Sequence, residues 1–257
     1  LTTVIDPGWG GLAAAAALMV AVVVAAWYSG IRLAKEGLIS SARATIQLLG
    51  IGLILGWVFA REQWWAITLI LIVMTLIAGF TAGRRVNNVL KSVGPVLTLV
   101  LGGVTAITLV YITQLAVGVH EFNAQYFIPI GGMILGNAMT SAVLASTRFM
   151  EDVKERRDKI EAALALGASP KQAVQEMTSK AFFAAVTPVM NAMLIVGIVK
   201  LPGVMVGTLL GGVDPFTAAK YQLVVMFMLS FGDGVTALLT LAIIRRKIFT
   251  PAWQLRM

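Results

Sequence analysis

One carboxylate lies deep inside an apolar stretch near the C-terminal end of the chain. Asp233 sits within residues 220–244, a run long enough to cross a bilayer. A charged side chain inside a membrane is costly, and it is usually paired with another charge or used in transport. Carboxylate oxygens suit cations, so Asp233 is the first candidate for a metal contact.

The opposite charge occurs in another apolar run, residues 38–60, where Arg43 is followed one turn later by Gln47. Three interpretations stay open for Arg43. It forms a structural pair with Asp233 inside each protomer, it lines a translocation path with Gln47 and Asp233, or it extends toward lipid phosphates.

Further polar and sulfur-containing side chains interrupt the apolar runs. Asn137, Ser141 and Asn191 are candidates for a translocation path, although a helix-packing seam of small residues explains the first two as well. Met139 and Met193 lie beside them and complete, with the carboxylate, a candidate set of metal ligands. Thioethers favour copper(I) over iron, and Met is also an ordinary filler of apolar packing.

Residues for catalysis are missing from this pattern. The chain has no Cys and one His, His120, which falls in a predicted loop, so no buried nucleophile with its base is expected. It also lacks the G-x-x-x-x-G-K-[ST] loop that holds the phosphates of ATP. We therefore expect no catalytic residue, no enzyme activity and no cofactor bound by this chain.

The composition shows which solvent surrounds these residues. The 257 residues are 58% hydrophobic and 12% charged, with a mean hydropathy of +0.88, which is too much apolar surface for one soluble core. Seven apolar runs reach membrane-spanning length. They lie at about 10–29, 38–60, 64–82, 95–119, 127–149, 182–200 and 220–244. The first is interpreted as a retained helix rather than a signal peptide, because no basic segment precedes it.

The basic residues alternate between the connections. Sixteen of the 20 Lys and Arg fall in alternate connections, Arg61, Lys200 and Lys220 lie in the opposite set, and Arg43 lies inside an apolar run. Basic loops are retained in the cytoplasm. The expected fold is an all-α polytopic membrane protein, residues 1–257 as one domain, with its N-terminus outside and its C-terminus inside. The net charge of +8 then reflects orientation, and no nucleic-acid partner is expected.

Residues 200–215 form a Gly-rich apolar segment that is too short to cross the membrane. Its repeated Gly residues and Pro202 predict an interfacial or re-entrant segment on the outer side. A plain outer loop is the alternative.

The longest predicted cytoplasmic connection, about 150–181, carries the strongest local signals. An amphipathic helix is expected to end near Gly167, which suits a left-handed backbone. The sequence "SPKQ" then places Ser169 as N-cap, Pro170 at the first helical position and Gln172 at the third, the pattern of a capping box. The chain should therefore turn sharply between the two helices, and this coupling-helix region should face the cytoplasm.

The same connection resembles a known docking motif. Glu161, Ala162, Ala163 and Gly167 match the E-A-A-x-x-x-G motif of ABC transporter permeases, whose coupling helix docks on an ATP-binding subunit. The likeness extends to "RATIQLLGIGLILGWVF" (43–59), "GMILGNAMTSAVLA" (132–145), "LPGVMVGTLLGGVDP" (201–215) and "YQLVVMFML" (221–229). Over residues 30–250 the chain resembles the FetB (YbbM) iron-export permease family, to which plant aluminium-tolerance permeases are similar.

This resemblance implies an iron exporter in the bacterial inner membrane, with a separate FetA-like ATPase that binds ATP and Mg. Its docking residues would be Glu161, Ala162, Ala163, Gly167, Ser169 and Pro170. A homodimer would supply two coupling helices for two ATP sites. The alternatives are ABC export of a different cargo, such as a sugar nucleotide, and an ion-coupled carrier or channel.

Overall fold

The computed structural model describes Asp6 and residues 8–30, 34–60, 63–87, 93–118 and 123–256. All of its long elements are helices, in two units. The first unit contains α1 (Gly8–Tyr28) and α2 (Ala34–Phe59), with residues 210–212. These two helices pack on each other closely, because a Cβ on Gly37 of α2 would lie 3.2 Å from Val23 of α1.

The second unit is a helix bundle. It contains α3 (Trp64–Asn87), α4 (Gly94–Tyr111), α5 (Ala124–Glu155), α8 (Gln175–Ile195) and α10 (Pro215–Ile248). A short π-helix, η1 (Ile112–Val117), extends α4. α5 is central, because α3, α4, α8 and α10 all pack against it.

Seven described helices are long and apolar enough to span a membrane, which confirms the predicted fold class and the number of spans. One boundary differs from the sequence prediction of 182–200. α8 already begins at Gln175 and ends at Ile195, and a turn follows in which Gly197 has φ 81° and its N–H donates to the Lys200 carbonyl. This left-handed Gly ends the helix early.

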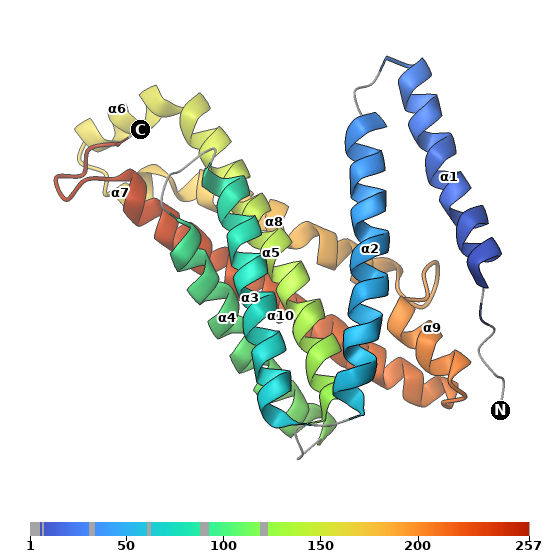
Figure 1. Ribbon diagram of the computed structural model, residues 1–257. Coiled ribbons are helices and arrows are strands. Elements are labelled where there is room, and N and C mark those ends of the chain that lie inside the picture. Colours follow the sequence, from blue (N-terminus) through green and yellow to red (C-terminus); the bar gives the residue numbers. More distant parts are fainter. Residues whose placement is uncertain are drawn as a thin grey trace. The chain divides into compact units, whose positions relative to one another are not determined.

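Two helices extend beyond the membrane core. α5 has 32 residues and α10 has 34, about 50 Å each at 1.5 Å per residue, against a hydrocarbon thickness of about 30 Å. Both run toward the end of the bundle that carries α6 (Arg157–Ala165) and α7 (Pro170–Ala173). Figure 1 shows the C-terminal end of the chain at this same end of the unit.

The Gly-rich segment 200–215 contains one short helix, α9 (Gly203–Leu210). Its eight residues are about 12 Å long, which is too short to cross the hydrocarbon. The interfacial or re-entrant position stays a prediction.

A close crossing of α3 and α4 is the basis of a stability prediction. A Cβ on Gly79 of α3 would lie 2.8 Å from the backbone Cα of Thr98 on α4, a contact that side-chain rotation cannot relieve. Gly79→Ala should therefore separate the helices and cost roughly 1–3 kcal/mol. Gly103→Ala is the matched control, because a Cβ there meets nothing within 4 Å. Thermal unfolding of the purified protein should show a lower midpoint for Gly79→Ala alone, and equal midpoints would contradict the crossing.

Candidate functional site: a capped turn and a buried polar face

The first candidate site consists of α6, α7 and the turn that joins them, residues 157–173, and is called the coupling turn below. Gly167 has φ 90°, the left-handed conformation expected from the sequence. The Ser169 hydroxyl accepts from the Gln172 N–H, and the Gln172 side chain accepts from the Ser169 N–H at 2.9 Å. The predicted capping box and the helix start at Pro170 are thus confirmed.

Apolar packing and ion pairs hold the coupling turn against the bundle. Ile160 and Val174 are fully buried in a cluster that contains residues of α5, α8 and α10, and Leu255 near the C-terminus packs on the same cluster. Arg156 forms a 3.1 Å ion pair with Glu176 at the start of α8. The turn therefore has a fixed position at the end of the bundle.

The other side of the turn is open. Leu166, at the tip of this charged segment, is 90% exposed. Glu161, Ala162 and Gly167 are exposed beside it, whereas Ala163, Ser169 and Pro170 are half-buried. Glu161 accepts a 2.8 Å hydrogen bond from Arg157, which raises the pKa of the Arg157 guanidinium. The exposed tip thus combines the apolar side chain of Leu166 with the Arg157–Glu161 ion pair.

The second candidate site surrounds Asp233 on α10. Asp233 is 5% exposed, and its Oδ1 has no hydrogen-bond partner. The Ser141 hydroxyl of α5 donates to the Asp233 backbone carbonyl at 2.9 Å, so two of the predicted path residues do lie together. This hydrogen bond places Ser141 of α5 beside Asp233 of α10 and so defines how the two helices are aligned along their axes.

The remaining candidates occupy different positions. Met193 on α8 accepts a 3.0 Å hydrogen bond from Ser230, about one turn before Asp233 on α10. Met139 instead packs in the apolar cluster of α3, α4 and α5, so it points away from the face of α5 that carries Ser141. Asn137 is exposed, and its side chain donates to its own helix at Met133. Asn191 is exposed on α8.

Arg43 and Gln47 lie one turn apart on α2, in the first unit. Asp233 belongs to the second unit, so the pairing of Arg43 with Asp233 stays a prediction. His120 lies outside the described residues. Within the described ranges, no group of three or more His, Asp and Glu side chains comes together. A cation near Asp233 would therefore meet one carboxylate and neutral oxygen atoms.

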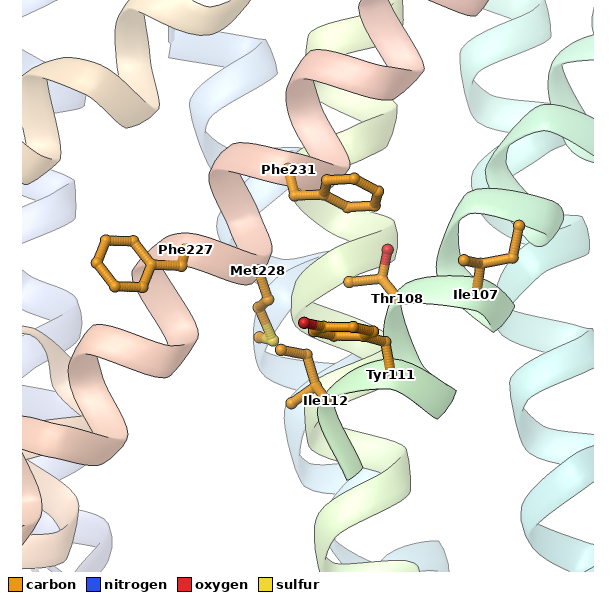
Figure 2. A pocket seen from close by; sticks show the side chains of 7 residues that line it. All are labelled: Ile107, Thr108, Tyr111, Ile112, Phe227, Met228 and Phe231. Carbon is orange, nitrogen blue, oxygen red and sulfur yellow. The ribbon is translucent and has the colours of Figure 1, made fainter. Parts of the chain in front are cut away.

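A cleft of about 420 Å³ opens between α4, η1 and α10 and is shown in Figure 2. Met228 and Phe231 of α10 face Tyr111 and Ile112 across it, and Phe227 of the same helix also lines it. The Thr108 hydroxyl in its wall donates to the Val104 carbonyl of its own helix at 2.7 Å. This lining suits hydrocarbon chains rather than a cation.

Three buried polar residues on the same helix as Asp233 were not predicted from the sequence. Gln222, Thr236 and Thr240 are 4% exposed or less, and each has a side-chain oxygen without a partner. Their spacing along residues 220–244 was available as a signal, because 222, 233 and 240 fall on one side of a helix. Leu166 was also overlooked, since exposure cannot be deduced from an apolar residue type.

The model of the family described as "Uncharacterised protein family (UPF0014)" matches residues 9–249. The UPF0014 membrane protein slr1647 of Synechocystis is 36% identical, covering 97% of this chain and 95% of the relative. No solved structure matches the chain.

Two further relatives carry names that refer to a phenotype or a function. Protein ALUMINUM SENSITIVE 3 of Arabidopsis thaliana is 33% identical, covering 95% of this chain and 88% of the relative. The "Probable iron export permease protein FetB" of Escherichia coli is 31% identical, with coverages of 95% and 93%. Because the family model and these relatives cover nearly the whole chain, the protein, a membrane protein with the character of a permease, belongs to the UPF0014 family.

Proposed function

We propose that this chain is the permease subunit of an ABC exporter, driven by ATP that a separate subunit hydrolyses with Mg. The coupling turn is the observation that carries this proposal. It is fixed on the bundle by Ile160 and Val174, it exposes Leu166, and it contains the E-A-A-x-x-x-G residues. A rigid element with an apolar tip transmits a movement of a docked partner to the long helices α5 and α8 better than a loose loop does.

The proposed cargo is a metal ion, with iron as the first choice. One relative is named a probable iron export permease, and Asp233 offers a buried carboxylate oxygen without a partner. Bare cations need oxygen, nitrogen or sulfur ligands in an apolar span, and one carboxylate among neutral groups would hold them weakly enough for release. Asn137, Asn191 and Met193 are additional contacts in this proposal, and Arg43 and Gln47 would line the path.

The proposed assembly is a homodimer in the bacterial inner membrane with two ATPase subunits. Two ATP sites need two docking elements, and two copies of the chain supply two coupling turns. The alternation of Lys and Arg supports an outer N-terminus and a cytoplasmic coupling turn. In that orientation the turn and the ATPase are on the same side of the membrane.

Transport by the reconstituted complex tests the proposal. The permease and its cognate ATPase are placed in vesicles, and ATP-dependent transport and ATPase activity are measured with Fe(II), Mn(II), Ni(II), Cu(I) and a sugar nucleotide. We expect stimulation by Fe(II) and ATP-dependent movement of the metal. Stimulation by the sugar nucleotide alone would overturn the metal cargo but leave the ABC permease assignment. If the permease neither binds the ATPase nor changes its rate with any of these cargoes, the whole proposal is wrong.

A further inference from the structure

Side-chain oxygens without a partner concentrate on one helix. Among the described residues, six buried side-chain oxygens have no hydrogen-bond partner, and four of them belong to α10. These four are on Gln222, Asp233, Thr236 and Thr240. The other two are Thr105 Oγ1 on α4 and Asp152 Oδ2 on α5. Buried polar atoms are nearly always hydrogen-bonded, so four exceptions on a single helix call for a physical reason.

Other buried hydroxyls in this protein behave differently. Thr108, Thr113 and Ser146 each donate to the backbone carbonyl four residues earlier in their own helix, at 2.6–2.8 Å. This internal bond is the usual way for a hydroxyl to become satisfied inside a membrane helix. Thr236 and Thr240 make no such bond, although both are fully buried. Their hydroxyls are therefore free to bind something else.

The four oxygens also line up along α10. At 100° per residue, Gln222, Asp233 and Thr240 fall within about 20° of one another, and Thr236 lies about 60° to one side of Asp233. The 18 residue steps from Gln222 to Thr240 extend about 27 Å, close to the roughly 30 Å thickness of the hydrocarbon core. The line thus runs through nearly the whole span, from the side of α9 to the side of the coupling turn.

The chemistry of this line suits a hard cation. A carboxylate, an amide oxygen and two hydroxyls are the oxygen ligands that hard divalent ions prefer. The nearby thioether of Met193 accepts a hydrogen bond from the Ser230 hydroxyl, so it is a lesser contact beside these oxygens. A buried carboxylate without a partner is also costly, and a bound cation would offset this cost.

We propose that the face of α10 that carries Gln222, Asp233, Thr236 and Thr240 is an oxygen-lined track along which each protomer passes a hard divalent cation. This inference rests on the proposed metal cargo and adds three residues to it. It also specifies selectivity, because Mn(II) should compete with Fe(II) on an oxygen track and Cu(I) should not.

The test uses Thr→Val exchanges, which keep the shape and remove the hydroxyl. The full complex in vesicles is compared as wild type, as Thr236→Val/Thr240→Val and as the control Thr108→Val, with ATP-dependent Mn(II) transport as the first measurement. The second is the thermal unfolding midpoint of the purified permease with and without Mn(II). Thr240→Ser, which retains a hydroxyl, serves as the rescue variant.

The expected result separates stability from transport. Thr236→Val/Thr240→Val removes hydroxyls without partners, so its unfolding midpoint without metal should equal or exceed that of the wild type. Its transport should fall roughly tenfold, the factor that corresponds to 1.4 kcal/mol, and its Mn(II)-dependent stabilisation should disappear. Thr108→Val should lose stability, because it loses a hydrogen bond, but keep its response to Mn(II).

Two outcomes would overturn the inference, and they differ. If the wild type transports metal and the double Val variant does so at the same rate, the track is wrong and the proposed function stands. If the wild-type complex transports neither Fe(II) nor Mn(II), the metal cargo is wrong, and the track falls with it.

Discussion

Gly167→Val should abolish the stimulation of the partner ATPase by the permease while leaving the permease folded and assembled. Gly167 has φ 90°, and a β-branched residue is a poor fit for that backbone conformation. A Cβ at this position meets nothing within 4 Å, so the strain comes from the backbone of the turn alone. Relief of that strain reshapes the tip around Leu166, which in the proposed function is the surface that the ATPase contacts.

The matched control is Gly167→Asn, since Asn tolerates the left-handed region better than other non-Gly residues. ATPase activity of the reconstituted complex should fall at least roughly tenfold for Val, a loss of about 1.4 kcal/mol, and stay near wild type for Asn. Glu161→Lys is a second test variant, because it reverses the exposed charge of Glu161, which forms a 2.8 Å ion pair with Arg157. Unaltered stimulation in both Gly167→Val and Glu161→Lys would show that the coupling turn is not the docking element.

The coupling turn could be predicted in detail because its signals are local. A left-handed Gly and an S-P-x-Q capping box specify backbone conformation within a few residues, and φ of Gly167 and the bonds of Ser169 agree with them. The number of spans was equally accessible, because a bilayer imposes a minimum length of apolar helix. Both features depend on sequence separations of a few to about twenty residues.

The faces of the helices were harder to predict, because they depend on partners far away in the sequence. Met139 and Ser141 are two residues apart on α5, yet one packs against α3 and α4 and the other bonds to α10. In a membrane helix nearly all residues are apolar, so the pattern that marks a buried face in a soluble helix is weak. Whether the hydroxyls of Thr236 and Thr240 have hydrogen-bond partners depends on the neighbouring helices, so it could be seen only in the structure.

The exchange Asp233→Asn should have the largest effect of any single change inside the spans. Asn keeps the size of the side chain and removes its charge, so the cost of a buried carboxylate without a partner disappears. Thermal stability should therefore stay equal or rise, while ATP-dependent Fe(II) transport falls by roughly tenfold or more, which is at least about 1.4 kcal/mol. Gly234→Ala is the control, because a Cβ next to Asp233 meets nothing within 4 Å.

Variants that also change Arg43 show whether Asp233 binds the cation or only forms a structural pair with Arg43. If Asp233 serves chiefly as the partner of Arg43, each single change, Arg43→Met or Asp233→Leu, leaves an unpaired charge and costs roughly 3–5 kcal/mol. The double change would then recover both folding and transport. If Asp233 contacts the cargo, the double variant folds but still does not transport, because no carboxylate remains on α10 between Pro215 and Ile248. Recovered transport in the double variant would therefore assign Asp233 to structure and leave the cation to other oxygens.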